Sequence, residues 1–338
     1  MTACNDIDAV DHPIPVFKTN IPVVRLDATD AAAFKYNVEH DLKELSEKDA
    51  IEQFQKESHA RLQQFLSRET ESLLHNMVGD SKSTSVVLLK GFPVEDDLPP
   101  TLTKPPVKKN GFLAEAILYG MAHIWGKTAT YKDMSPAMLK PPVLGEVGTL
   151  KDLVTTDQSS SMELKMHRDF ALAPDANIPE IRLIHCLRPD KARQVQTRVA
   201  DGRDVVRQLD PKDVHTLRTV PVQFRTASGQ QMGCSKLVIT GSEEHPILSL
   251  LEIAFLGKGA HVTADDPAAV EAYHRASDLA MRVAAGVKLE EGDVLCIHNG
   301  SRALHARTES PHEADGYGRW LKVTLVMGYD RIARMTSS

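Results

Sequence analysis

His167 and Asp169 stand two residues apart, on either side of Arg168. In a β-strand, residues two apart point to the same face, so this pair could present an imidazole and a carboxylate to one metal ion. A half-exposed histidine near a surface aspartate would give the same sequence pattern without binding a metal. Its meaning depends on whether the rest of the chain supplies further ligands.

A third candidate ligand lies near the C-terminus. A turn at Gly292 leads into an apolar run, a second turn at Asn299 reverses the chain, and His305 follows on the next segment. This return could bring His305 back to the first two ligands. Arg319 follows His305 by fourteen residues and begins the apolar segment 321–327. A buried arginine at that place needs an anion, because an unpaired charge in a protein interior is costly.

Two histidines and one carboxylate on one face of a metal ion are the ligand set of non-haem iron(II) oxygenases, which leaves three coordination positions open. A 2-oxo acid could fill two of them and O2 the third, while an arginine fork holds the far carboxylate. Arg319 is the candidate for this fork. The same ligands could instead hold zinc in a hydrolase, but that alternative leaves Arg319 unexplained. In a non-catalytic jelly-roll binding protein, the third alternative, the ligands would be incidental.

These residues and their neighbours, taken in order, resemble the iron(II)/2-oxoglutarate-dependent dioxygenases, specifically the taurine dioxygenase and clavaminate synthase-like group that includes many amino-acid hydroxylases. The resemblance covers residues 85–330. It rests on the ordered set Gln158 to Ser161, Glu163-Leu164, His167-Arg-Asp169, Leu187 to Asp190, Thr197, Gly292-Asp293, His305-Ala-Arg307 and Arg319-Trp320-Leu321. Each motif alone is weak, whereas their order and the step from His305 to Arg319 make the set specific.

The resemblance implies a double-stranded β-helix in which His167, Asp169 and His305 bind Fe(II). It also implies that Arg319 binds the distal carboxylate of 2-oxoglutarate, with Thr197 adding a hydroxyl donor. The implied reaction consumes 2-oxoglutarate and O2, yields succinate and CO2, and hydroxylates an unactivated C–H bond of a small amino-acid-like or amino-acid-derived substrate. Desaturation, epoxidation or cyclisation in a biosynthetic pathway stays open, because the outcome depends on how the substrate is placed. Halogenation is not expected, because related halogenases carry a small residue at the position of Asp169.

Three further residues near the motifs bear on the site. Arg307, two residues after His305, is expected to contact the cosubstrate or to brace a carboxylate beside the metal. The group often carries a second arginine four residues after the cosubstrate arginine, where it binds the substrate's α-carboxylate. Val323 occupies that position here, which argues against a free α-amino acid as substrate. Lys322 is adjacent but should point to the opposite face of the strand.

Substrate contacts are expected from two loops, 134–158 and 242–266, which we predict to act as lids. Gln158 and Ser160 are the candidates near the first loop, and Glu252 and Asp265 are those in the second. The acidic residues of the second loop could favour a cationic substrate, although exposed loops are commonly acidic in a protein of negative charge.

Two other histidines could be mistaken for ligands. His298 lies at the turn before His305, where the group commonly has Asp before Asn, and we expect it to support the turn or the ligands indirectly. His185 stands in an apolar segment and is expected to be packed or hydrogen-bonded in the core.

The elements that must position these residues follow from the hydrophobic pattern. Residues 31–77 contain no Gly or Pro and are rich in helix formers, which predicts one or two surface helices. A strand is predicted at 85–91, a helix at 112–125 and an ordered loop at 128–161. Further strands are predicted at 181–187, 196–200, 220–225, 237–240, 294–298 and 321–327, with a helix capped by Asp266 and Pro267 between them.

The expected fold class is therefore mainly β with added helices (α+β), with the core that the resemblance implies, a cupin-like jelly roll. We expect a single domain over residues 1–338. Residues 1–80 would form an N-terminal helical extension, packed on a dioxygenase core over residues 81–335.

Composition limits the possible partners. The chain carries 40 Lys and Arg against 46 Asp and Glu, whereas nucleic-acid-binding proteins usually show a basic excess or stripe. No apolar stretch approaches about 18 residues and the opening lacks a signal-peptide pattern, so we expect a cytoplasmic protein without a membrane partner. Its four cysteines are widely separated, which fits neither a disulfide framework nor a cysteine zinc site. The expected partner is a small molecule, free or bound to a carrier protein, and the sequence carries no signal for an oligomeric state.

Overall fold

The computed structural model describes residues 18–47, 51–101, 109–129, 145–148, 163–251, 253, 258–310 and 316–336. The strands are β1 (Val23–Arg25), β2 (Val86–Lys90), β3 (Gly126–Ala129), β4 (Gly145–Gly148), β5 (Leu164–His167), β6 (Ile181–Arg188), β7 (Thr197–Asp201), β8 (Val222–Arg225), β9 (Gln231–Lys236), β10 (Ile239–Gly241), β11 (Pro246–Leu248), β12 (His261–Thr263), β13 (Ala285–Val287), β14 (Val294–Ile297), β15 (Ala303–Arg307) and β16 (Trp320–Gly328). The helices are α1 (Ala28–Asp41), α2 (Lys43–Glu47), α3 (Ile51–Phe65), α4 (Arg68–Gly79), α5 (Leu113–Ala122), α6 (Gly202–Gln208), α7 (Pro211–Thr219), α8 (Pro267–Val283) and α9 (Tyr329–Thr336), with a short 3-10 turn at Asp175–Asn177.

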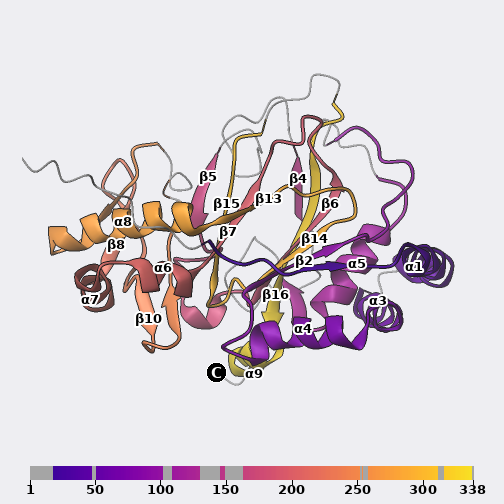
Figure 1. Ribbon diagram of the computed structural model, residues 1–338, viewed down its shortest axis with the longest axis horizontal. Helices are drawn as coiled ribbons and strands as arrows, with labels where there is room; N and C mark the ends of the chain where they lie inside the picture. Colours follow the sequence, from indigo (N-terminus) through magenta and orange to yellow (C-terminus); the bar gives the residue numbers. More distant parts are fainter. Residues whose placement is uncertain are drawn as a thin grey trace, which may run out of the picture.

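Two sheets form the centre of the molecule (Figure 1). The larger has the strand order β1-β2-β14-β6-β16-β3, with β4 also paired to β16, and the smaller has the order β13-β7-β15-β5. Apolar side chains of both sheets meet in one buried cluster, which includes Leu88 and Ile184 from the larger sheet and Val199 from the smaller. This strand-rich architecture with added helices confirms the expected α+β class.

Alternation along β6 shows how the larger sheet is buried on both faces. Ile184 and Cys186 belong to the cluster between the sheets, whereas Leu183 packs with the helices on the outer face. Side chains two apart share a face of a strand, so the charged residue Arg182 is directed into the space between the sheets.

The N-terminal helices differ from the expected one or two surface helices, because the segment breaks into four. Asp27 caps α1, and Ser67 caps α4 by accepting a hydrogen bond from the backbone N–H of Thr70, so a new helix begins there. Phe34 and Leu74, on α1 and α4, are buried in a cluster shared with α5 and the larger sheet. These helices are therefore part of the core packing as well as of the surface.

A second apolar cluster lies against the smaller sheet. Helices α6 and α8 and the strands β8, β10, β11 and β12 contribute to it, together with Met166 of β5 and Leu304 of β15. Helix α8 begins as predicted, since Asp266 accepts a hydrogen bond from the backbone of Ala268 and Pro267 occupies the first turn. The Tyr273 hydroxyl both accepts from and donates to the backbone of Leu251, at 3.0 Å in each case.

The segments expected as lid loops contain strands. Within 134–158 the structure describes β4, which pairs with β16, and the rest of that segment lies outside the described residues. Within 242–266 it describes β11, paired with β10, and β12, paired with β8. Backbone hydrogen bonding to neighbouring strands therefore fixes parts of both segments.

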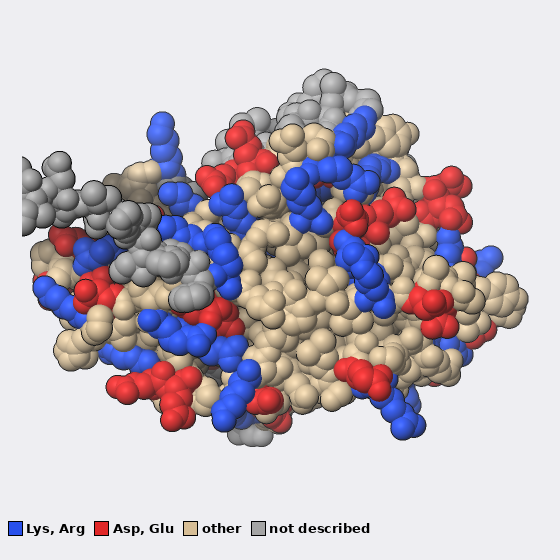
Figure 2. Space-filling model, in the orientation of Figure 1, with Lys and Arg blue, Asp and Glu red and all other residues tan. Residues whose placement is uncertain are grey.

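Acidic and basic side chains alternate over the face shown in Figure 2, around a largely uncharged centre. This mixed distribution agrees with the absence of a basic excess in the sequence. Among the described helices, none combines the length and the hydropathy needed to cross a membrane.

Candidate metal centre

His167 and His305 face each other across two neighbouring strands of the smaller sheet. His305 lies on β15, which pairs with β7 on one side and β5 on the other, and His167 is its direct partner at the end of β5. The two ring centroids are 4.3 Å apart, and both residues are buried. The sheet register thus brings together two imidazoles that are far apart in the sequence.

Asp169 completes the cluster from outside the strand. β5 ends at His167, and Asp169 lies in the turn that follows, before Phe170 with its left-handed φ of 60°. The prediction that His167 and Asp169 share a strand face is therefore wrong in its reason, although the two side chains do converge. A turn, unlike a sheet, does not fix the direction of the carboxylate, so other residues must hold it.

The three side chains form a compact set of potential metal ligands. One ligand atom from each lies within 4.8 Å of the others. Asp169 Oδ1 is 4.0 Å from His167 Nε2, and Asp169 Oδ2 is 3.7 Å from His305 Nε2. His167 Nδ1 lies 2.8 Å from the carbonyl oxygen of Lys165, which places the proton on Nδ1 and makes Nε2 the nitrogen that can bind a metal. Neither ring nitrogen of His305 has a hydrogen-bond partner among the described residues.

Charge and burial favour the protonation states that a metal needs. Burial alone raises the pKa of Asp169, but the guanidinium of Arg182 and the two histidines outweigh it and bring that pKa to about 2. Burial, reinforced by His167, lowers the pKa of His305 well below its usual value. At neutral pH the site thus offers an anionic carboxylate beside a neutral imidazole, and these donors fit divalent iron.

Two residues that the sequence analysis missed hold Asp169. Asn299 is fully buried; its Oδ1 accepts from the Asp169 backbone N–H at 2.8 Å, and its Nδ2 donates to the carbonyl oxygens of Asp169 at 3.3 Å and Pro179 at 3.0 Å. Arg182 of β6 donates from Nη1 to Asp169 Oδ2. The sequence signals were an Asn-Gly turn, which was interpreted only as a reversal of the chain, and a charged residue within the largely apolar strand β6.

Arg319 lies where an anion would be needed. Its side chain is buried with only 2% exposure, and Nη2 donates to Thr197 Oγ1 at 3.2 Å. Its Nη1 has no hydrogen-bond partner among the described residues. A buried guanidinium with an unfilled donor is suited to binding a carboxylate, and the Thr197 hydroxyl lies beside it.

Arg307 lies next to this pair, since it is the direct partner of Thr197 across β15 and β7. It is buried, and burial together with the charges of Arg319 and Arg182 lowers its pKa to about 10. The guanidiniums of Arg319 and Arg182 are therefore near enough to Arg307 to make a second positive charge there unfavourable.

Of the four predicted substrate contacts, the structure describes only Asp265. Gln158, Ser160 and Glu252 lie outside the described residues. Asp265 is exposed before the first turn of α8, whereas the far end of that helix leads to β13, beside β7 (Figure 1). The structure therefore does not place Asp265 beside the metal ligands.

Val323 and Lys322 take opposite faces of β16, as predicted. Val323 belongs to the apolar cluster between the sheets. Lys322 lies on the outer face, where its Nζ is 2.6 Å from Glu115 Oε1 of α5. Position 323 of β16 therefore supplies no positive charge to the space between the sheets, and Lys322 points away from it.

His298 and His185 lie outside the ligand set, as expected. His298 Nε2 is 2.7 Å from Glu180 Oε1, and its Nδ1 accepts from Arg302 Nε at 2.8 Å. His185 is fully buried on the outer face of β6, and burial lowers its pKa to about 3. Its ring nitrogens have no hydrogen-bond partner among the described residues, so it is packed but not hydrogen-bonded.

Comparisons with known proteins agree with this geometry. A model of the family described as "Taurine catabolism dioxygenase TauD, TfdA family" matches residues 41–325. Clavaminate synthase 2 from Streptomyces clavuligerus is 29% identical over 245 residues, which cover 70% of this chain and 71% of that protein.

Solved structures share the fold at low sequence identity. Asparagine oxygenase, in complex with Fe(II), 2S,3S-3-hydroxyasparagine and succinate, is similar with a TM-score of 0.72 and 22% identity, over 90% of this chain and 93% of that one. The non-heme iron oxygenase OrfP, in complex with Fe, succinate and (3R,4R)-dihydroxy-L-Arg, is similar with a TM-score of 0.72 and 17% identity, over 93% and 96%. The expected jelly-roll fold is thereby confirmed.

The family match extends over most of the chain and includes every residue of the His-Asp-His cluster and Arg319. The chain belongs to the taurine catabolism dioxygenase TauD, TfdA family and is an iron(II)- and 2-oxoglutarate-dependent dioxygenase.

Proposed function

We propose that this enzyme hydroxylates a C–H bond of a small amino-acid-derived molecule at the centre formed by His167, Asp169 and His305. The observation that carries the proposal is the direct pairing of His305 with His167 across β15 and β5, with the Asp169 carboxylate beside both. When bound there, Fe(II) supplies the capacity to activate O2 at the cost of one 2-oxoglutarate, which leaves as succinate and CO2.

Each residue has a distinct task in this proposal. His167 binds the metal through Nε2, because its Nδ1 proton is held by the Lys165 carbonyl oxygen. Arg319 and Thr197 bind the distal carboxylate of 2-oxoglutarate and so orient its keto acid end towards the metal. Arg307, the strand partner of Thr197, adds positive charge beside Arg319 and reinforces binding of the dianionic cosubstrate. The apolar cluster between the sheets excludes water from the reacting centre.

The substrate class is supported by the proteins that share the fold. The ligands named for asparagine oxygenase and OrfP are hydroxylated amino acids. Val323 cannot bind the substrate's α-carboxylate as an arginine at that position would. We therefore propose that the substrate is an amino-acid derivative rather than a free α-amino acid. Gln158, Ser160 and Glu252 stay the predicted contacts for it, and a carrier-bound form of the substrate is compatible with the same chemistry.

We also propose that the chain acts as one domain in the cytoplasm, with residues 1–80 packed on the catalytic core at 81–335. Helices α1 to α4 share a buried apolar cluster with the larger sheet, which supports a single folding unit. Three of the four cysteines lie in the described part and are free thiols, as a reducing compartment requires.

The test is an anaerobic titration of the metal-free protein with Fe(II) and then with 2-oxoglutarate. The visible charge-transfer band of the chelate is the signal measured. The band is expected in the wild type, absent in His305→Ala, and shifted to much higher 2-oxoglutarate in Arg319→Ala. Amino acids and their derivatives are then screened as substrates by measuring the succinate formed in the presence of each. No band with the wild type, combined with tight zinc binding, would refute the proposal.

A further inference from the structure

The carboxylate of Asp169 has two oxygens, and the structure treats them differently. Each oxygen lies near one histidine, Oδ1 at 4.0 Å from His167 Nε2 and Oδ2 at 3.7 Å from His305 Nε2, but it is Oδ2 that accepts a hydrogen bond from Arg182 Nη1. Both Asp169 and Arg182 are nearly buried, with 11% and 13% of their side chains exposed. The ion pair is therefore only weakly screened by water.

Arg182 is delivered to this oxygen by a rigid part of the fold. It lies on β6, a central strand of the larger sheet, and pairs with Ile297 of β14 on one side and Leu325 of β16 on the other. Its inward direction follows from Ile184, two residues later, which belongs to the cluster between the sheets. The guanidinium thus reaches Asp169 from the sheet opposite to the one that carries both histidines.

An oxygen that already accepts from a guanidinium is a poorer donor to a divalent cation, because the positive charge withdraws electron density and repels the ion. The other oxygen, Oδ1, keeps its full donor strength. If both oxygens bound the metal, the carboxylate would occupy a fourth coordination position. Only two positions would then remain, and a chelating 2-oxo acid needs both of them.

We propose that Arg182 is a positioning residue that confines Asp169 to one-oxygen coordination and so keeps a third position open beside 2-oxoglutarate. This inference rests on the proposed metal centre. Asn299 has a different task, because it contacts only the backbone of Asp169, through two hydrogen bonds, and a third to the Pro179 carbonyl oxygen anchors its own side chain. The two residues therefore divide the work: Asn299 places the residue, and Arg182 selects the oxygen.

The division predicts opposite effects of substitution on metal binding. Arg182→Met frees Oδ2 and removes a positive charge near the ion, so the affinity for the metal should stay the same or rise. The open position should be lost. Asn299→Ala loosens the whole ligand, so metal affinity should fall by about tenfold or more, as for other residues that support a ligand.

The experiment uses Mn(II) as the probe, with the full-length protein and saturating 2-oxoglutarate. Free Mn(II) is measured by electron paramagnetic resonance, and exchangeable metal-bound water by the relaxation rate of the water protons. For the wild type we expect a clear relaxation enhancement from one bound water. For Arg182→Met the enhancement should fall to the level given by outer-sphere water, with no loss of Mn(II) affinity. Arg182→Lys, which keeps the charge without the fork, should be intermediate.

Arg203→Met is the matched control. Arg203 and Asp201 form an ion pair at 2.6 Å with similar burial, 17% and 7% side-chain exposure, but neither residue belongs to the metal cluster. This control should leave both readouts unchanged. Thermal unfolding of each metal-free variant shows whether it is folded.

Two results would overturn the inference. One is a full relaxation enhancement in Arg182→Met. The other is a fall in Mn(II) affinity in Arg182→Met as large as that in Asn299→Ala, which would make Arg182 a structural support only. If the wild type itself binds neither Mn(II) nor 2-oxoglutarate, the proposed function fails, and that result is separate from a change confined to the Arg182 variants.

Discussion

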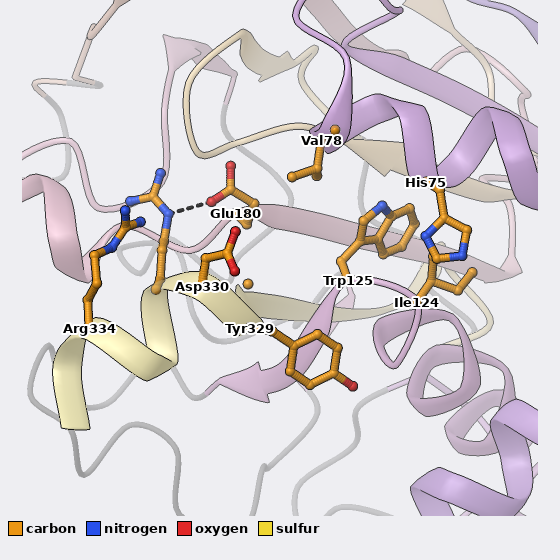
Figure 3. Close-up of a pocket in the computed structure, with 11 residues that line it drawn as sticks. His75, Val78, Ile124, Trp125, Glu180, Tyr329, Asp330 and Arg334 are labelled. Carbon is orange, nitrogen blue, oxygen red and sulfur yellow. Dashed lines mark hydrogen bonds and ion pairs between the residues drawn. The ribbon is translucent and has the colours of Figure 1, made fainter. Parts of the chain in front are cut away.

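Glu180 Oε1 lies 2.7 Å from His298 Nε2, and this contact fixes the tautomer of the histidine. His298 Nδ1 accepts from Arg302 Nε, so the proton must reside on Nε2 and is donated to Glu180. The other carboxylate oxygen of Glu180 accepts from Arg331, the pair joined by the dashed line in Figure 3. A buried carboxylate thus joins helix α9 to the turn that precedes β15, the strand that carries His305.

The pocket drawn in Figure 3 is distinct from the metal centre. Glu180, Trp125 and Tyr329 are among its lining residues, and none of the three proposed metal ligands lines it. We expect this pocket to matter for stability, because one carboxylate oxygen of Glu180 faces Arg331 and the other faces buried His298.

Replacing Glu180 by Gln should destabilise the protein by about 3 kcal/mol at neutral pH, because half-buried Arg331 and buried His298 lose their anionic partner. Burial raises the pKa of Glu180, but His298 and Arg331 outweigh this effect and bring it to about 2. A depressed pKa gives stability that is present above the value of the unfolded chain and is lost as pH falls towards the folded value. The difference between Glu180→Gln and wild type should therefore shrink between pH 4.5 and pH 2.

Urea unfolding at several pH values measures this effect. Asp330→Asn is the control, because Asp330 lines the same pocket but is exposed. A constant difference across the acidic range would contradict the role given to the Glu180 charge.

The sequence predicted which side chains gather at the site better than it predicted the residues that hold them in place. His167, Asp169, His305 and Arg319 are polar residues at fixed spacings, which can be recognised without a structure. The roles of Arg182 and Asn299 depend instead on which strands and turns face one another across the molecule. No local pattern contains that information, because β6 meets the turn after β5 only through the packing of two sheets.

The helices and strands show the same difference between features set by local sequence and features set by distant contacts. Strand β2 and helices α5 and α8 were predicted near their observed limits, since alternation, caps and breakers are local signals. The break of residues 31–77 into four helices was missed, because that segment contains no Gly or Pro and its breaks depend on caps such as Ser67. The strands inside the supposed lid loops were missed because their pairing partners are distant in sequence.

Arg319→Ala should raise the 2-oxoglutarate concentration needed for half-maximal formation of the chelate band on the order of 100-fold, because two charge-assisted hydrogen bonds are lost. Thr197→Val, which removes only the hydroxyl at 3.2 Å from the guanidinium, should raise it about fivefold. Affinity for Fe(II) alone should not change in either variant and serves as the internal control. Equal effects of both substitutions would show that the arginine does not carry the cosubstrate's charge.

His185→Leu should make the protein more resistant to acid. His185 is fully buried near Glu115, Lys109 and Lys322, and burial lowers its pKa to about 3. Since the unfolded chain takes up a proton near pH 6.5 and the folded one does not, the wild type loses stability as pH falls below that value. At pH 5 the variant should gain about 2 kcal/mol relative to its difference from wild type at pH 8. Thermal unfolding at the two pH values tests this, and an unchanged difference would show that the folded protein protonates His185 as readily as the unfolded chain does.

Gly292→Ala should unfold the turn that leads into β14. Gly292 has a φ of +78°, and an added Cβ would lie 2.0 Å from the carbonyl oxygen of Phe92, a backbone atom that cannot rotate away. The same backbone also donates to Cys186 at 2.9 Å and accepts from Phe92 at 3.1 Å. Moving the chain to relieve the clash would break these bonds, so we expect a loss of about 3 kcal/mol or more in the free energy of unfolding.

Gly229→Ala separates the two causes of this loss. Gly229 has a similar φ of +84°, but nothing lies within 4 Å of an added Cβ. Its substitution should therefore cost only the strain of a left-handed alanine, about 1 kcal/mol. Chemical unfolding of both variants compares them directly. If Gly292→Ala were no worse than Gly229→Ala, the close approach to Phe92 would not constrain the turn, and the path of the chain into β14 and on to His305 would be set by the strands alone.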